Sequence, residues 1–315
     1  MLSFASGKSF AVPLFVQMLV CSFLWGAAFI LLKLAGTSLS PLALTAIRGL
    51  MAGTLILLFM GLTGHNILPR GRELRDWIVL GFLQGVVPNT LTAYALTQIS
   101  AGLTSMLQAS TPLIVAILAQ ALFASERLTL KTALGLLIGF GGMLLLIGPA
   151  AFGAGSVNPQ GIASVVIVAF SYALGTLYVR SIPGAQPIRL AAGQQLFSGL
   201  PTFAAVMLLT GPSGFAPALD ALPLLLVLGI FGTAMPIVIY MNILKKAGPT
   251  LGSMNGYFLP PWTILLGFAL LGEPVSLREV FATVIVLSGV ALVSVKVETL
   301  RRLWGRVVPV QPKVC

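Results

Sequence analysis

Residues 12–34 read VPLFVQMLVCSFLWGAAFILLKL, and Lys33 is the only charged residue among them. An α-helix needs roughly 20 mostly apolar residues to cross a bilayer. This stretch therefore predicts a membrane-spanning helix. Its length favours a span that is retained in the protein over the shorter apolar core of a signal peptide.

Similar apolar runs recur along the whole chain, separated by short segments that contain glycine, proline and charged residues. Ten runs are long enough to be spans, so the sequence predicts an all-α integral membrane protein with ten transmembrane helices. The runs cover approximately residues 12–34, 41–60, 77–98, 101–123, 131–149, 159–181, 187–209, 221–244, 248–271 and 279–297.

Composition excludes several other classes of protein. Hydrophobic residues make up 57% of the 315 residues and charged residues only 8%, whereas a soluble domain carries about a quarter charged residues. An ordinary soluble enzyme, a disordered chain and a disulfide-rich secreted domain are thereby excluded. Cys21 and Cys315 support neither a disulfide framework nor a metal site, so we expect no metal and no cofactor.

The basic residues follow the pattern of a topology signal. With the N-terminus in the cytoplasm, 15 of the 18 Lys and Arg residues fall on cytoplasmic segments, and only Lys33 and Arg278 fall outside. This asymmetry predicts that both termini are cytoplasmic and that residues 299–315 form a cytoplasmic basic tail. Because these charges lie in short loops, the net charge of +11 does not indicate nucleic-acid binding.

The two halves of the chain resemble each other at offsets of 146 to 148 residues. Each half contains five predicted spans, and an odd number forces the second copy to enter the membrane upside down. The sequence thus predicts two inverted repeats, over residues 11–150 and 157–298, which is an arrangement frequent in transporters. Matching positions include Trp25 with Tyr172, Arg48 with Gln194, Gly53 with Gly199, Pro88 with Pro236, Pro112 with Pro260, and Glu126 with Glu273.

A family resemblance rests on a motif that occurs twice. The first copy comprises Ala101-Gly102, Thr111-Pro112, Glu126-Arg127-Leu128-Thr129 and three glycines at 135, 139 and 142; the second includes Gly272-Glu273-Pro274-Val275-Ser276. The chain resembles the ten-helix, EamA-type permeases of the drug/metabolite transporter superfamily, and within it most closely the YddG-type exporters of aromatic amino acids. The second copy departs from the first at Pro274 and Pro261. The resemblance implies a multi-pass permease of the bacterial inner membrane that moves small metabolites through a central cavity.

Four prolines lie within predicted spans at a constant offset of 148 between the halves. A proline inside a helix bends it and frees the carbonyl group four residues earlier. Freed carbonyl groups at membrane depth must be satisfied by protein or must face a cavity. We therefore expect helix kinks beside a cavity, with purely structural kinks as the alternative, at Pro88, Pro112, Pro236 and Pro260.

Polar and aromatic residues accompany these prolines and define a candidate substrate cavity. Taken one at a time, such residues more often form hydrogen bonds between helices. Taken together they predict an amphipathic cavity for an aromatic or apolar zwitterion or a flat cation, with Trp25 and Tyr172 facing each other across it. The candidates are Trp25, Asn89, Tyr94, Gln108, Thr111, Tyr172, Tyr240, Asn242, Asn255, Tyr257 and Trp262.

Charge inside the predicted spans is scarce. The spans contain no acidic residue at mid-depth and the single histidine, His65, lies in a loop, so a uniporter or exchanger is favoured over a proton-coupled carrier. Arg48 lies about seven residues into the second span. We expect its side chain to extend toward the headgroups, with capture of a substrate carboxylate as the alternative.

These features predict a secondary transporter of small amphipathic metabolites, including aromatic amino acids, that works by alternating access. The alternatives are an exporter of cationic drugs or nucleoside-like metabolites, a channel, or a membrane-embedded enzyme. No HExxH motif or Ser/His/Asp set occurs within the spans, so we expect no enzymatic activity. The expected partners are the substrate and membrane lipids, without nucleic acid. Glycine pairs with GxxxG spacing, such as Gly49 and Gly53, favour packing within one chain over dimerisation, which leaves a monomer or a homodimer.

Overall fold

The computed structural model describes residues 13–99, 101–123, 129–147, 158–272 and 275–294. The motif residues Glu126 and Glu273, and the predicted tail at 299–315, lie outside the described residues.

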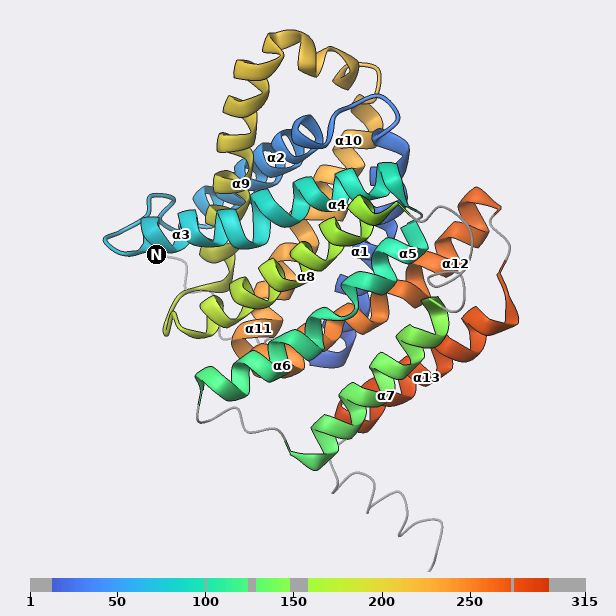
Figure 1. Cartoon of the computed structure of the whole chain (residues 1–315). Helices are drawn as coiled ribbons and strands as arrows, with labels where there is room; N and C mark the ends of the chain where they lie inside the picture. The colour runs from blue at the N-terminus through green and yellow to red at the C-terminus, as the bar shows by residue number, and fades with distance from the viewer. Residues whose placement is uncertain (1–12, 100, 124–128, 148–157, 273–274, 295–315) are drawn as a thin grey trace, which may run out of the picture.

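Every regular element in this part of the chain is a helix (Figure 1). Most helices are α-helical, and short π-helical or 3₁₀-helical segments join some of them. In chain order they are α1 (Leu14–Ala35), α2 (Pro41–Leu62), α3 (Glu73–Gly81), η1 (Phe82–Val86), α4 (Val87–Gln98), α5 (Ala101–Gln108), α6 (Thr111–Leu122), α7 (Leu130–Ile147), α8 (Pro159–Arg180), α9 (Pro187–Leu209), η3 (Gly211–Ala218), α10 (Leu222–Gly229), η4 (Ile230–Ala234), α11 (Met235–Ser253), η5 (Met254–Phe258), α12 (Leu259–Leu271) and α13 (Leu277–Ser294).

Six helical stretches are long and apolar enough to cross a membrane, or seven if α9 and η3, bent by 116°, count as one span. The protein is therefore a multi-pass membrane protein. Length alone yields fewer spans than the ten predicted, for two reasons. The stretch Leu222–Leu270 runs for 49 residues, although Gly248 within it has a non-helical φ of 80°. In addition, α7 and α13 enter this count only over Leu130–Gly142 and Val280–Gly289, within the described part of the chain.

Two long helices begin at side-chain caps. The Ser40 hydroxyl oxygen accepts a hydrogen bond from the backbone N–H of Ala43 at 3.2 Å, at the start of α2. The Asn158 side-chain oxygen accepts one from Gln160 at 2.9 Å, at the start of α8. A proline follows each cap, where its missing N–H costs nothing because that group has no partner within a helix.

Glycines bring two pairs of helices into close contact. A Cβ atom on Gly53 of α2 would lie 2.8 Å from the Leu196 nitrogen of α9, and one on Gly199 of α9 would overlap the Leu50 backbone of α2. α7 packs against α13 in the same manner, since a Cβ on Gly289 would lie 2.6 Å from backbone atoms of α7. Figure 1 shows α7 and α13 side by side. For Gly53 the predicted close packing within one chain is confirmed.

Each of the four prolines is the second residue of a helical segment that follows a break. The π-helical segment η1 ends two residues before Pro88, and η4 ends two residues before Pro236. The carbonyl group that Pro88 frees is that of Gln84, which accepts a hydrogen bond from the Gln194 side-chain nitrogen at 3.0 Å. A neighbouring helix thus satisfies a group that the break releases.

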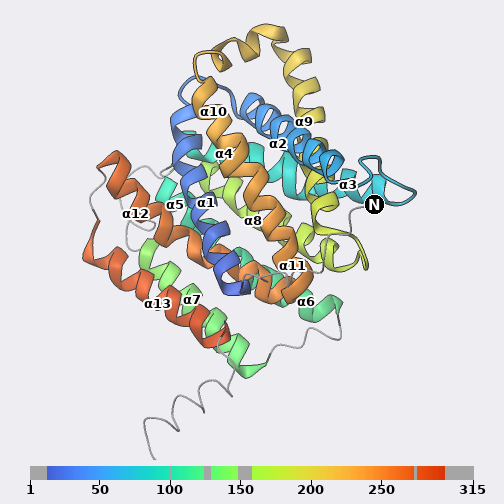
Figure 2. The ribbon, with the colours of Figure 1, turned by 180° about the vertical axis from the view of Figure 1, so that it is seen from behind.

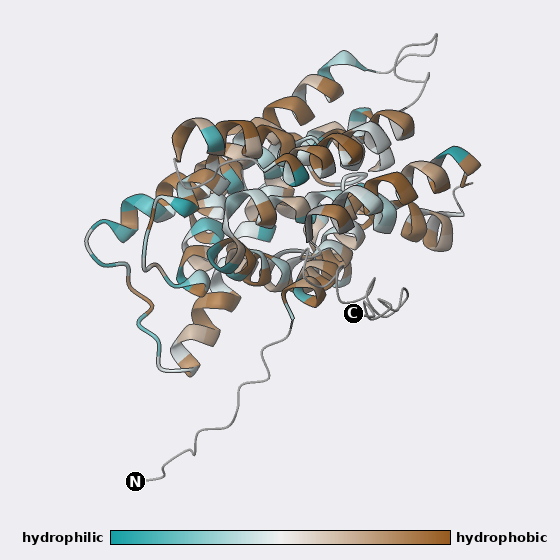
Figure 3. Ribbon diagram, turned by 90° about the horizontal axis from the view of Figure 1, so that it is seen from below, coloured by the Kyte–Doolittle hydropathy of each residue, from teal (hydrophilic) through white to brown (hydrophobic). Residues whose placement is uncertain are grey.

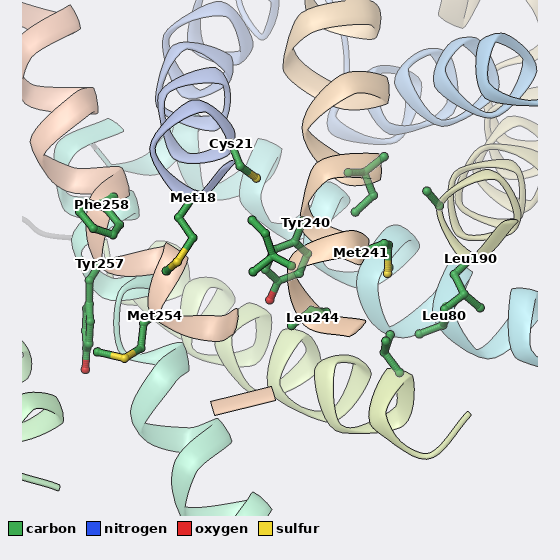
Figure 4. Packing of buried hydrophobic residues seen from close by; sticks show 14 of the residues in the cluster. Met18, Cys21, Leu80, Leu190, Tyr240, Met241, Leu244, Met254, Tyr257 and Phe258 are labelled. Atoms are coloured by element: carbon green, nitrogen blue, oxygen red, sulfur yellow. The ribbon is translucent and has the colours of Figure 1, made fainter. Parts of the chain in front are cut away.

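Apolar side chains cover both the inside and the outside of the molecule. Figure 3 shows most helical surface in the hydrophobic colours, and Leu62 and Leu208 are 88% and 87% exposed. A surface of this kind suits lipid rather than water. Inside, Figure 4 shows the Tyr240 ring between Met254 on one side and Leu190 on the other, within one buried cluster.

Candidate functional site

A cavity of about 90 Å³ lies among helices from both halves of the chain. All described helices from α1 to α6, except α3, contribute to its wall, together with η1, α8, α9, η4, η5, α11 and α12. α1 belongs to the first half of the chain and α11 to the second, and both line the cavity. Figure 2 shows these two helices next to each other. Among the described residues α7 and α13 contribute nothing to the lining. The polar and aromatic lining residues are Trp25, Phe29, Arg48, Gln84, Asn89, Thr92, Gln108, Thr111, Tyr172, Gln194, Gln195, Thr233, Tyr240 and Ser253.

Six of the eleven residues proposed from the sequence line this cavity. The Trp25 ring meets the Tyr240 ring edge-on, with centroids 4.9 Å apart and an interplanar angle of 61°. Tyr172 lies in the same wall, but the aromatic neighbour of Trp25 is Tyr240 rather than Tyr172. The cavity therefore has an aromatic side built largely by α1 and α11. The six residues are Trp25, Asn89, Gln108, Thr111, Tyr172 and Tyr240.

Two other candidates form hydrogen bonds between helices instead. The Tyr94 hydroxyl donates to the Gln160 side-chain oxygen at 2.8 Å, which joins α4 to α8. The Asn242 amide donates to the Gln17 side-chain oxygen at 2.6 Å, which joins α11 to α1. Both residues lie outside the lining, and their contacts match the alternative interpretation of such residues.

The last three candidates lie in packing contacts outside the lining, where Asn255 and Tyr257 are buried and Trp262 is half-buried. Asn255 is fully buried, and its amide approaches the Cys21 sulfur at 3.6 Å. The Tyr257 hydroxyl donates to a backbone carbonyl oxygen of α7 at 3.3 Å. The Trp262 ring packs edge-on against Phe23, with centroids 5.2 Å apart. The structure therefore corrects the expectation that these side chains face the cavity. Each lies on a face of η5 or α12 that meets a neighbouring helix.

None of the four prolines lines the cavity, although each lies beside it. The backbone of Gly256, whose carbonyl group Pro260 frees, is part of the wall. The Gln108 carbonyl oxygen, which Pro112 frees, accepts from the Thr111 hydroxyl at 2.7 Å. The breaks thus bring backbone and short polar side chains to the wall.

Arg48 departs most from its predicted position. Its side chain is only 6% exposed, and its Nε donates to the Thr233 hydroxyl oxygen at 3.0 Å. The Thr233 hydroxyl in turn donates to the Leu228 carbonyl oxygen at 2.9 Å. The expectation that Arg48 extends to the headgroups is wrong, because η4 offers an acceptor at its depth and the cavity leaves room for its charged end.

Three glutamine side chains form a second polar group in the wall. Gln84, Gln194 and Gln195 are each at most 3% exposed. The Gln84 and Gln194 side-chain nitrogens donate to the Thr176 hydroxyl and the Gln84 backbone oxygen. All three side-chain oxygens lack a partner among the described residues. A donor on a bound molecule can satisfy such buried acceptors, which are costly when unpaired.

These glutamines and Thr233 are not among the site residues that the sequence predicts. One signal for them was present, because Gln194 occupies the position in the second half that Arg48 occupies in the first. Without the orientation of each helix, nothing distinguished these amides from those that join helices.

A separate polar cluster joins the starts of α3 and α9. The Arg189 guanidinium pairs with both Glu73 carboxylate oxygens at 2.6 Å and also donates to the backbone oxygen of Leu68 at 2.8 Å. The guanidinium carbon lies 5.8 Å from the centroid of the Trp77 ring. Glu73 precedes the cavity residue Gln84 by 11 residues, which is about 16 Å along a helix. The cluster therefore closes one end of the helix bundle rather than the cavity itself.

Comparisons with known proteins identify the family and the fold of the chain. The model of the EamA-like transporter family matches residues 14–148 and 159–295. The uncharacterized inner membrane transporter YedA of Escherichia coli K12 is 29% identical over 90% of this chain and 91% of its own length. An uncharacterized transporter of Archaeoglobus fulgidus is 27% identical over 85% and 94%. A solved crystal structure described only as that of a protein has the same fold, with a TM-score of 0.71, 21% identity and coverage of 91% and 97%. The names of the relatives indicate a transporter rather than an enzyme.

Proposed function

Because the chain belongs to the EamA-like transporter family, we propose that it is a secondary carrier that moves small amphipathic metabolites by alternating access. The observation that carries this proposal is the cavity built by helices from both family-matched segments, with aromatic rings and amide side chains in its wall. A cavity between two similar halves can open to either side as the halves exchange conformations.

The proposed architecture has ten spans in two inverted repeats, with both termini in the cytoplasm. The break at Gly248 supports it, because it divides the 49-residue helical stretch into two segments. The π-helical segments η1 and η4 also support it, since both precede a proline at an offset of 148. The distribution of basic residues supports the orientation.

This orientation is testable by labelling single cysteines in a chain without Cys21 and Cys315. A cysteine replacing Ser213 should react with an impermeant thiol reagent added outside intact cells. A cysteine replacing His65 should react only after the membrane is opened. The reverse pattern would exclude the proposed orientation.

The proposed location is the bacterial cytoplasmic membrane, and the proposed substrates are amino acids, including aromatic ones. The name of the Escherichia coli relative supports the location. The contact between Trp25 and Tyr240 supports an aromatic or apolar side chain on the substrate. No acidic side chain occurs among the described lining residues, whereas Arg48 does. This charge pattern disfavours the cationic drugs that the sequence left open.

Counterflow uptake into proteoliposomes tests the function. Vesicles loaded with unlabelled L-phenylalanine should accumulate labelled L-phenylalanine transiently and saturably, while empty vesicles should not. A parallel panel of L-threonine, a nucleoside and a quaternary ammonium compound defines the range of substrates. Unsaturable flux with electrical conductance would instead indicate a channel, and no flux of any compound would contradict the proposed activity.

A further inference from the structure

One positive charge lies in the cavity wall without an acidic neighbour. Arg48 is 6% exposed, and within the described part of the chain it has no ion-pair partner. We propose that Arg48 binds a carboxylate group of the transported molecule and thereby restricts the cavity to substrates that carry one. This inference rests on the proposed carrier function and names its substrate class.

The geometry of the guanidinium group supports this role. Its Nε is held by the Thr233 hydroxyl at 3.0 Å, and that hydroxyl is held by the Leu228 carbonyl oxygen. The two terminal nitrogens have no hydrogen bond to a described residue. Together they form a planar fork that matches the two oxygens of a carboxylate. A buried charge is most stable when such a partner is present.

The unpaired glutamine oxygens extend the site to a zwitterion. Gln84, Gln194 and Gln195 line the same cavity, and their buried side-chain oxygens lack donors among the described residues. An ammonium group supplies three donors and is drawn to amide oxygens rather than to a guanidinium group. The carboxylate end therefore faces α2 and η4, and the ammonium end faces η1 and α9.

A purely structural role for Arg48 makes a different prediction. In that case its function is the hydrogen bond between α2 and η4, and any side chain that donates to Thr233 replaces it. Arg48→Gln retains an N–H donor but removes the charge, while Arg48→Lys retains the charge. The two variants therefore separate charge recognition from helix attachment.

The test measures binding to the purified full-length protein through ligand-dependent shifts in melting temperature. The probes are L-phenylalanine, 3-phenylpropionate and L-phenylalaninamide, of which only the last lacks a carboxylate. The native protein should bind the two carboxylates at least about tenfold more tightly than the amide. Arg48→Gln should lose at least about tenfold in affinity for both carboxylates and should no longer discriminate, whereas Arg48→Lys should keep part of the discrimination. Lys33→Gln, which removes a positive charge outside the lining, should behave as the native protein.

Several outcomes would overturn the proposal. The first is equal affinity of the native protein for L-phenylalanine and L-phenylalaninamide, and the second is no binding of either carboxylate. The third is that folded Arg48→Gln still prefers the carboxylates to the amide as strongly as the native protein does. If Arg48→Gln does not fold, Arg48→Met takes its place, and unchanged discrimination in that folded variant would overturn the proposal. Carboxylate binding without counterflow would contradict the carrier function while leaving this inference intact. Counterflow of L-phenylalanine and L-phenylalaninamide at equal rates would contradict this inference while leaving the carrier function intact.

Discussion

Arg48 and Gln194 occupy equivalent positions in the two family-matched segments and make equivalent contacts with different chemistry. Arg48, on α2, donates to Thr233 in the π-helical segment η4. Gln194, on α9, donates to the backbone of Gln84 in the π-helical segment η1. Each thus reaches the broken helix of the opposite segment. Both contacts join an α-helix to a π-helical segment, whereas only Arg48 brings a charge. The two contacts therefore contribute chemically different groups to the wall of the cavity.

The shared part of this comparison should be the most sensitive to mutation. Gly53 packs against Leu196 and Gly199 packs against Leu50, which are also equivalent pairs. Gly53→Ala and Gly199→Ala should each lower the free energy of unfolding by about 1–3 kcal/mol, because the added methyl groups meet the backbone of the other helix. The measurement is the melting temperature in detergent.

Gly141→Ala is the matched control, since a Cβ atom there meets nothing within 4 Å. It should not lower the melting temperature, because alanine favours a helix over glycine. If Gly53→Ala and Gly199→Ala lower the melting temperature by very different amounts, the two glycine contacts do not contribute equally to stability.

Moving the guanidinium group from position 48 to position 194 tests the difference in charge between these two positions. Arg48→Gln should reduce the affinity for 3-phenylpropionate at least about tenfold. The double variant Arg48→Gln/Gln194→Arg places the guanidinium group at the equivalent position and should recover affinity to within about threefold of the native protein. Binding is followed by the same thermal shift. Failure of the double variant to recover, although it folds, would indicate that the position of the charge matters as much as its presence.

The aromatic positions should respond unequally. Trp25 and Tyr172 are equivalent, but Trp25 contacts Tyr240. Trp25→Ala should slow counterflow of L-phenylalanine by about three- to tenfold, since ring contacts contribute about 0.5–1.5 kcal/mol beyond burial. Tyr172→Ala should cause a smaller loss, and L-threonine should be affected less than L-phenylalanine by both. Equal losses for the two amino acids would indicate a packing role only.

The smallest expected effect concerns two acidic residues, Glu73 at the start of α3 and Asp220 just before α10. Glu73 pairs with Arg189 at 2.6 Å, whereas Asp220, at an offset of 147, is exposed. Glu73→Gln should lower the free energy of unfolding by about 1 kcal/mol, because the pair is only partly screened by solvent. Asp220→Asn should leave the melting temperature unchanged. A larger loss for Asp220→Asn would contradict this difference between the halves.

The prediction of the candidate site from the sequence was only partly matched by the structure. Trp25 and Tyr240 line the cavity as expected, but Tyr257 and Trp262 pack between helices instead. All four residues satisfy the same sequence criterion, a large ring within a predicted span. What separates them is the rotation of each helix about its own axis. The helical period alone does not reveal that rotation when every face of the helix is apolar.

The sequence by itself determined that this is a multi-pass helical membrane protein, because the transfer of an apolar run into lipid depends on the composition of about 20 neighbouring residues. It also predicts which positions of the two halves correspond. Only the tertiary structure decided which polar groups meet. Arg48 and Thr233 are 185 residues apart in the chain, and Gln194 and Gln84 are 110 apart. Their contacts depend on the close approach of helices at glycines and on the breaks near the prolines. A buried charge or amide takes its role from the neighbours that this packing supplies, and no local stretch of sequence contains them.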